Sequence, residues 1–100
     1  MHVKFTQSGG MMGLVRACTL ETSSMDAAEA KALEALVRKA DLAESGEVLS
    51  RGGRDLEEYE IAIDDGHGRV TVVRDQSTLT PEAKALVAYL KKCAKPAKLK

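Results

Sequence analysis

The chain has 100 residues, of which 44% are hydrophobic and 30% charged. It is too apolar to be disordered and too short for two ordinary domains, so we expect a single domain over residues 1–94. Its 15 basic and 15 acidic residues cancel to a formal net charge of zero, which argues against nonspecific nucleic-acid binding. No stretch approaches the roughly 20 apolar residues that a bilayer requires, so no membrane partner is expected.

The first two elements are expected to be strands at residues 3–7 and 14–20, because apolar and polar residues alternate there. Ser8-Gly9-Gly10 lies between them. Adjacent glycines permit the positive φ of a tight reversal, so the segment is typical of a β-hairpin.

An amphipathic helix is expected from Met25 onward, because apolar residues recur there at intervals of three and four. Ser23 or Ser24 is the expected N-cap. Residues 43–55 are rich in glycine, serine and charge and predict an irregular connection. We expect this connection to be pinned by Val48 and Leu49, its only strongly apolar pair.

A second hairpin is expected from residues 59–63 and 70–73, which are rich in β-branched residues and joined by a polar, glycine-containing link. A final amphipathic helix opens with Thr80-Pro81-Glu82, which combines an N-cap, a first-turn proline and a first-turn carboxylate. Residues 95–100 are expected to be a flexible basic tail. No apolar leader follows Met1, so the expected compartment is the cytoplasm.

The order of elements is ββαββα, and each helix has one apolar stripe. This predicts an α+β fold with a four-stranded antiparallel sheet and both helices packed on one face. The opposite face of the sheet is expected to meet water, because Lys4, Thr6, Glu58 and Glu60 alternate with the apolar strand positions.

Some residues suggest a metal site or a catalytic site but are better explained by a structural role. Asp64-Asp65-Gly66-His67-Gly68 contains carboxylates and an imidazole, but these residue types are favoured in turns and no second ligand cluster accompanies them. Cys18 and Cys93 lack the spacing of a zinc site and are expected to be small apolar thiols, since a bridge between them requires oxidising conditions. A Cys18–His67 catalytic pair lacks a third, orienting group. We therefore expect no metal, no cofactor, no catalytic residue and no enzymatic activity.

The glycine-rich turn contains one unexplained feature, the adjacent Met11 and Met12. Gly10-Met11-Met12-Gly13 has the spacing of a KH-domain loop, but that loop joins two helices, whereas this one follows a strand. It does not form a phosphate cradle either, because no helix begins there. Apolar side chains at a turn must fold back or face water, and exposed methionines are common on adaptable binding surfaces.

Five segments spread over nearly the whole chain match one known pattern. They are Met1-His2-Val3-Lys4-Phe5, Ser8-Gly9-Gly10-Met11-Met12-Gly13-Leu14, Leu33-Glu34-Ala35-Leu36-Val37, Tyr59-Glu60-Ile61 and Leu86-Val87-Ala88-Tyr89-Leu90. Together they resemble the protealysin inhibitor (emfourin) family of small bacterial proteins. The most specific part of the resemblance is the SGGxxG turn combined with the order of elements. The chain departs from the family pattern at Met11, where an aromatic residue is common.

The resemblance implies a monomeric inhibitor of a thermolysin-like zinc metallopeptidase that blocks the substrate cleft with a loop or a strand edge. An extended edge or hairpin mimics a bound substrate, and apolar side chains on a glycine turn suit an apolar pocket. The expected contact residues are Ser8, Gly9, Gly10, Met11, Met12 and Gly13. Two alternatives remain. One is a noncatalytic interaction or regulatory module, homodimeric through an edge strand or the open sheet face. The other is nucleic-acid binding through the lysine tail.

Overall fold

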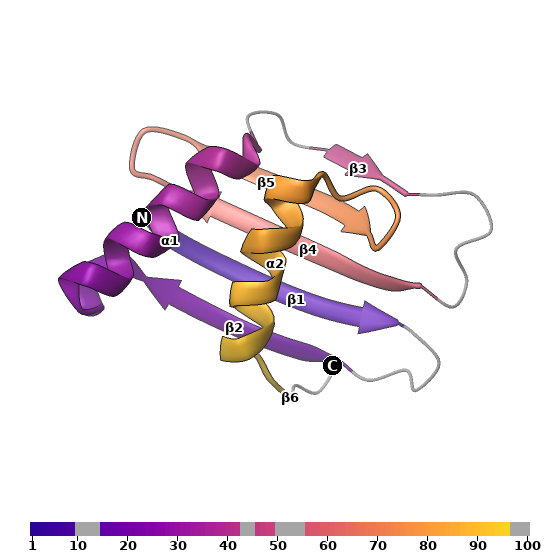
Figure 1. Ribbon diagram of the computed structural model, residues 1–100, viewed down its shortest axis with the longest axis horizontal. Coiled ribbons are helices and arrows are strands. Elements are labelled where there is room, and N and C mark those ends of the chain that lie inside the picture. Colours follow the sequence, from indigo (N-terminus) through magenta and orange to yellow (C-terminus); the bar gives the residue numbers. More distant parts are fainter. Residues whose placement is uncertain (10–14, 43–45, 50–55, 97–100) are drawn as a thin grey trace.

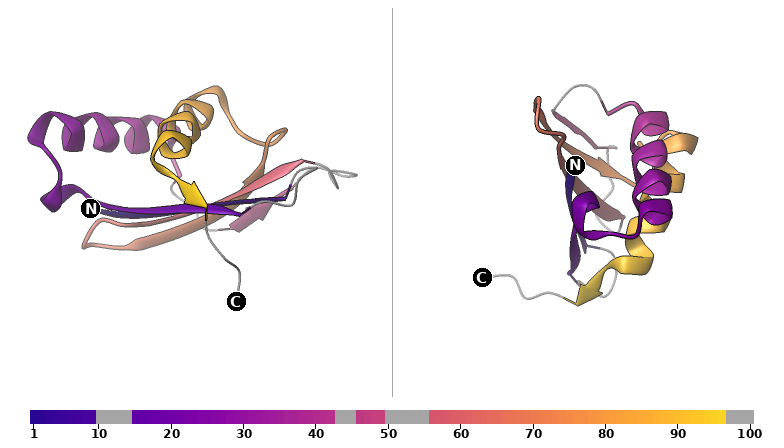
Figure 2. Two further views of the ribbon diagram at one scale, coloured as in Figure 1. Left: turned by 90° about the horizontal axis from the view of Figure 1, so that it is seen from below. Right: turned by 90° about the vertical axis from the view of Figure 1, so that its left-hand side faces the viewer.

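The computed structural model describes residues 1–9, 15–42, 46–49 and 56–96, apart from the side chain of Glu47. Two helices lie on the same side of one β-sheet (Figures 1 and 2). The elements in chain order are β1 (His2–Gly9), β2 (Arg16–Glu21), the 3-10 helix η1 (Thr22–Ser24), α1 (Ala27–Ala40), β3 (Gly46–Val48), β4 (Glu57–Asp64), β5 (Arg69–Asp75), α2 (Pro81–Cys93) and β6 (Lys95–Pro96).

The sheet has the strand order β3-β5-β4-β1-β2-β6. The α+β class, the two helices and the antiparallel core are confirmed, but the prediction of four strands is wrong. β6 adds a fifth antiparallel strand beside β2, and β3 joins the other edge by parallel pairing with β5. These two strands have only two and three residues, which is too short for an alternating pattern to reveal them.

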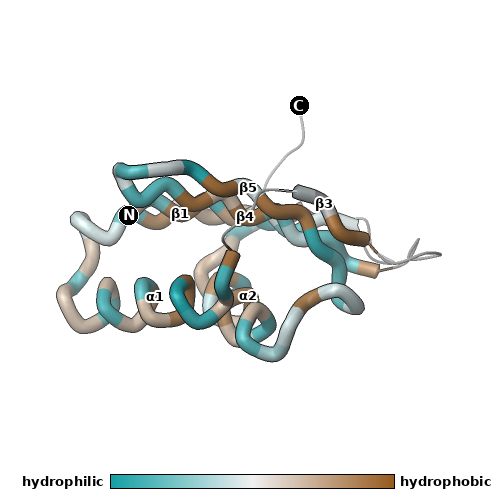
Figure 3. Tube along the Cα trace, turned by 90° about the horizontal axis from the view of Figure 1, so that it is seen from above, coloured by the Kyte–Doolittle hydropathy of each residue, from teal (hydrophilic) through white to brown (hydrophobic). Residues whose placement is uncertain are grey.

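The core lies between the sheet and the helices. On β1 and β4 every second side chain points inward, and Phe5 stacks on Tyr59 with ring centroids 6.1 Å apart. Figure 3 shows apolar positions recurring along the strands and helices. The most deeply buried apolar residues are Val3, Phe5, Leu33, Tyr59, Ile61, Val72, Leu86 and Leu90.

The helix caps agree with the sequence prediction at one helix and differ at the other. The Thr80 hydroxyl accepts a hydrogen bond from Ala83 N, as expected for an N-cap followed by Pro81. The N-cap of α1 is Asp26, whose carboxylate accepts from Ala28 N. The prediction of Ser23 or Ser24 is wrong because both serines lie in η1. The α-helix begins only after η1 has ended, with Asp26 as its N-cap.

Val48 and Leu49 do not pin the connection that follows α1. Val48 is 50% exposed and Leu49 is 36% exposed, so the expectation that they anchor this segment is wrong. Polar contacts hold β3 instead: Thr78 Oγ1 donates to Val48 O at 2.7 Å, and Arg74 Nη1 donates to Gly46 O at 2.8 Å. Residues 43–45 and 50–55 of the predicted connection lie outside the described part of the chain.

Two residues of the predicted basic tail, Lys95 and Pro96, instead pair with Ala17 and Arg16 as β6. Residues 97–100 lie outside the described part of the chain. On the far face of the sheet Lys4, Glu58 and Glu60 are exposed and Thr6 is half-buried, as the alternation predicts. Within the described ranges neither helix has the length and apolar character needed to span a membrane.

Leu90 is fully buried between α2 and the sheet. Leu90→Ala is expected to lower the free energy of unfolding by about 2–5 kcal/mol, because it removes apolar contacts and leaves a cavity. Urea denaturation measures this change. Lys92→Ala, an exposed change two residues away, is the control and should shift stability by no more than about 0.5 kcal/mol; equal effects of the two variants would contradict the assigned core.

Candidate functional site

The predicted contact residues lie at one end of the sheet, where β1 ends and β4 begins. Ser8 and Gly9 are the last residues of β1, and Gly9 is paired with Glu57, the first residue of β4. Gly10, Met11, Met12 and Gly13 lie outside the described residues, so the structure positions only the stem of the expected turn. The β4–β5 turn lies at the opposite end of the sheet, because His2 pairs with Asp64.

Gly9 has a positive φ of 82°, a conformation that costs a residue with a side chain about 1–3 kcal/mol. A Cβ atom at Gly9 would lie 3.0 Å from the carbonyl oxygen of Leu56. Backbone on the neighbouring segment thus comes close to Gly9 just before the predicted turn. Both the conformation and the close approach require glycine at this position.

A polar cluster lies on the buried side of the sheet next to this stem. The carboxylate of Glu57 accepts hydrogen bonds from Gln7 Nε2, from the Tyr59 hydroxyl at 2.9 Å and from Lys91 Nζ at 3.0 Å. Lys91 Nζ also lies 5.0 Å from the centroid of the Tyr59 ring, within the range of a cation–π interaction. The cluster therefore joins β1, β4 and α2.

The surroundings of the cluster favour its charged form. Burial alone would raise the pKa of Glu57, but the hydrogen bonds from Lys91 and Tyr59 outweigh it and hold that pKa below the ordinary 4.5. Burial likewise opposes the charge on Lys91, yet the Tyr59 and Glu57 oxygens raise its pKa above the ordinary 10.5. Glu57 and Lys91 thus form an ion pair at neutral pH, with Gln7 and Tyr59 completing the hydrogen bonds of the carboxylate.

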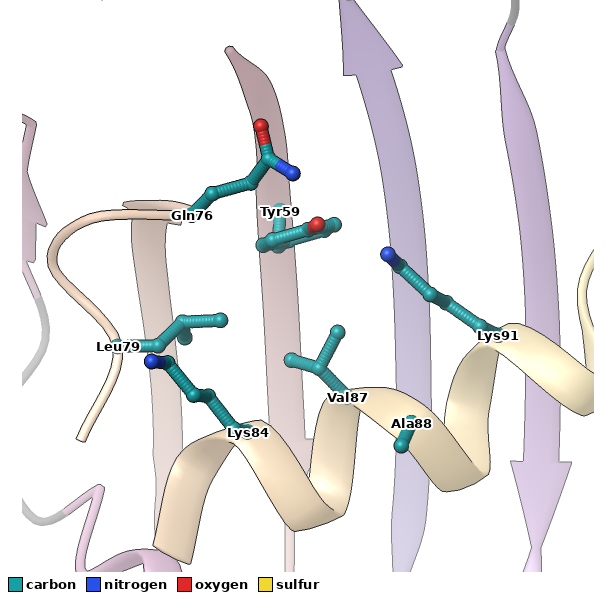
Figure 4. Close-up of a pocket in the computed structure, with 7 residues that line it drawn as sticks. All are labelled: Tyr59, Gln76, Leu79, Lys84, Val87, Ala88 and Lys91. Carbon is teal, nitrogen blue, oxygen red and sulfur yellow. The ribbon is translucent and has the colours of Figure 1, made fainter. Parts of the chain in front are cut away.

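A small cavity of about 220 Å³ adjoins the cluster, between β4, the segment before α2 and α2 itself. In Figure 4 the Lys91 side chain extends from α2 toward the Tyr59 ring, and Val87 and Leu79 form an apolar side. The lining residues of the cavity are Tyr59, Gln76, Leu79, Lys84, Val87, Ala88 and Lys91.

The acidic turn is confirmed as a turn. Asp64 Oδ1 accepts from Gly66 N at 3.0 Å, and Asp65 Oδ1 accepts from the backbone N–H groups of His67 and Gly68, both at 2.8 Å. These carboxylates therefore stabilise the backbone of the turn itself. Among the described residues no group of three or more histidine, cysteine or acidic side chains is arranged to hold a metal ion.

The structure gives Cys18 and His67 different neighbours. His67 is exposed in the β4–β5 turn, whereas the Cys18 thiol contacts the carbonyl of Leu90 on α2 at 3.7 Å. The described residues thus contain no Cys18–His67 pair.

Sequence reasoning missed the Glu57 cluster, although one signal was present. Gln7 occupies the third inward position of β1 after Val3 and Phe5, and a polar residue in such a series requires a buried partner. The partner could not be named, because Glu57 and Lys91 lie 50 and 84 residues further along the chain than Gln7.

The family model described as Emfourin matches residues 5–91. The chain belongs to the emfourin family. No curated protein and no solved structure matches it significantly. Membership of the emfourin family implies metallopeptidase inhibition in general, a role that requires no catalytic group on the inhibitor itself.

Glu57→Gln tests the ion pair of this emfourin. The folded-state pKa of Glu57 is lowered, so its charge stabilises the fold above about pH 4.5 and this stabilisation is lost as the pH falls through the lower folded-state value. We expect Glu57→Gln to lower the urea midpoint at about pH 7, and the difference from wild type to disappear near about pH 3.

Glu58→Gln is the matched control, because Glu58 is exposed and faces the opposite side of the same strand. It should leave the urea midpoint nearly unchanged at both pH values. A difference between Glu57→Gln and wild type that stays constant over this pH range would contradict the ion pair.

Proposed function

We propose that this protein inhibits a thermolysin-like zinc metallopeptidase by inserting the β1–β2 turn into the substrate cleft. The proposed contact residues are Ser8, Gly9, Gly10, Met11, Met12 and Gly13. The observation that carries the proposal is the match to the emfourin family over residues 5–91. That match includes the whole SGGxxG turn, residues 5–9 of β1 and all of β2.

The stem of the turn supports this role because it is held rigidly. Gly9 approaches the backbone of Leu56, and the bonds of Glu57 to Gln7 and Lys91 fix the ends of β1 and β4 against α2. A preorganised stem lowers the ordering cost that a flexible peptide pays when it binds. The proposed turn would therefore be presented to the enzyme with little loss of conformational freedom in its stem.

The chemistry of the turn suits a peptidase cleft. Peptidases of this kind bind substrates in extended form, so a hairpin end offers matching backbone groups. Met11 and Met12 supply flexible apolar side chains that adapt to an apolar subsite. The proposed mechanism is occlusion of the cleft, with the zinc ion left in the enzyme.

Inhibition is tested by titrating the protein against thermolysin with a peptide substrate. We expect inhibition that is competitive with substrate, with zinc still bound to the inhibited enzyme as measured by metal analysis of the isolated complex. Unchanged activity at micromolar concentrations, both with thermolysin and with a metallopeptidase from the same organism, would contradict the proposed function.

The contribution of the turn is tested with two variants. Gly9→Ala is expected to weaken inhibition at least about tenfold, since strain and the contact with Leu56 O displace the turn. The double variant Met11→Asp, Met12→Asp is expected to weaken it by at least as much, because it places charges in an apolar subsite.

Gly66→Ala is the matched control for Gly9→Ala. Gly66 also has a positive φ, 88°, but it lies in the β4–β5 turn at the other end of the sheet, and a Cβ there meets no atom within 4 Å. Circular dichroism confirms that each variant is folded. Full inhibition by both turn variants would show that another surface blocks the enzyme.

One observation favours the alternative of pairing between copies. β3 lies at the edge of the sheet, and its last residue Val48 and the following Leu49 are exposed. Apolar edge strands invite pairing with another chain. Light scattering separates the two cases, because pairing through β3 predicts a dimer that Val48→Lys dissociates, whereas the inhibitor is expected to be a monomer.

A further inference from the structure

Two cysteines that are far apart in the sequence both lie where the end of α2 packs against β2. Cys18 on β2 and Cys93 in the last turn of α2 are both free and half-buried. Cys18 Sγ lies 3.7 Å from the carbonyl oxygen of Leu90. Cys93 follows Leu90 by three residues and therefore lies on the same face of the helix, one turn further along.

Backbone pairing brings the two cysteine positions together independently of that contact. In the β2–β6 register Ala17 is opposite Lys95. The next step of an antiparallel register sets Cys18 beside Ala94, the residue directly after Cys93. Opposed Cα atoms in such a pair are about 4.5–5.5 Å apart. This distance applies to Cys18 and Ala94, and the Cα atom of Cys93 is about 3.8 Å from that of Ala94. The register therefore places Cys93 near Cys18, and a disulfide requires a Cα separation of about 4.4–6.8 Å.

The same junction is held by further contacts. Arg16 Nη2 donates a hydrogen bond to Ala94 O at 3.0 Å, and Ala94 N donates to Leu90 O at 2.9 Å. Ala94 is only 4% exposed. Arg16 thus links β2 to the residue directly after Cys93, and the cap bond to Leu90 closes the last turn of α2.

The directions of two pKa shifts agree with a short distance between Cys18 and Cys93. Burial raises the pKa of Cys18, and the neighbouring Cys93 thiolate raises it further. Burial also raises the pKa of Tyr89, followed by the charges of Cys93, Glu29 and Cys18. Like charges act on one another in this way mainly at short range.

We propose that Cys18 and Cys93 are an oxidative modification site, at which a low-molecular-weight disulfide such as oxidised glutathione converts the two thiols into an intramolecular disulfide. One cysteine thiolate attacks the glutathione disulfide and releases one glutathione thiolate. The second cysteine thiolate attacks the protein sulfur of the mixed disulfide and releases the other glutathione thiolate. Two protein thiols are oxidised and one glutathione disulfide is reduced, so the electrons balance.

The bond would join β2 covalently to the end of α2. It closes most of the chain into one loop, which restricts the unfolded state and stabilises the folded one. The inference is independent of the proposed inhibitory turn, because it concerns the end of α2 and needs no partner protein.

The test incubates the reduced full-length protein with oxidised glutathione at about pH 8.5, where the thiolate fraction of a cysteine is larger than at neutral pH. We expect intact-mass analysis to show the loss of two hydrogen atoms, and peptide mapping under non-reducing conditions to show Cys18 linked to Cys93. The oxidised protein should remain the same size in gel filtration. Its unfolding midpoint should rise by at least about 5 °C and return after reduction.

Cys18→Ser and Cys93→Ser are the matched controls, and each should stop at a single glutathione adduct or remain unmodified. Accumulation of two glutathiones on the wild-type chain would overturn the proposal, because it would show that the thiols cannot reach each other. A disulfide between two copies, or an oxidised form that unfolds at a lower temperature, would overturn it as well.

Discussion

Burial of one face of the central strand pair, β1 and β4, beneath α2 is the constraint on which the rest of the structure depends. Phe5 and Ile61 are directly paired in the sheet and fully buried, as are Leu86 and Leu90 on the helix. Because strand side chains alternate with period two, burying this face fixes the register of both strands. It also turns their charged residues outward and sets where α2 begins and ends relative to β2.

The polar cluster at Glu57 is a consequence of this register. Gln7 follows Val3 and Phe5 on the buried face, so its amide nitrogen donates to Glu57 inside the protein. Tyr59 and Lys91 donate to the same carboxylate. Compared with an apolar pair of similar size, a partly buried ion pair adds little net stability, because the cost of removing charges from water offsets their attraction. Removing one partner alone is destabilising, because it leaves the other charge unpaired. Its effect here is geometric: it holds β1, β4 and α2 together at the place where Gly9 leads into the turn proposed to bind a peptidase.

The start of β2 connects the proposed turn to the end of α2. Near its start, Arg16 bonds the carbonyl of Ala94, and β6 extends the sheet beside it. These contacts bring the end of α2 to Cys18. The proposed turn comes before Arg16 in the chain, and Cys18 of the proposed disulfide comes after it. The disulfide would therefore link α2 to β2, the strand that forms one side of the turn.

The elements with a clear periodicity were predictable from the sequence: four strands, two helices, the Thr80 cap and the Asp64–Gly68 turn all follow from local residue patterns. The family resemblance, carried by the SGGxxG turn, gave the class of function. The tertiary structure alone decided the positions of β3 and β6, the exposure of Val48, the pairing of Gln7 with Glu57 and the contact of Cys18 with the end of α2. Short edge strands carry too few residues for a period, and contacts between distant residues depend on how the helices and strands pack, which no local pattern encodes.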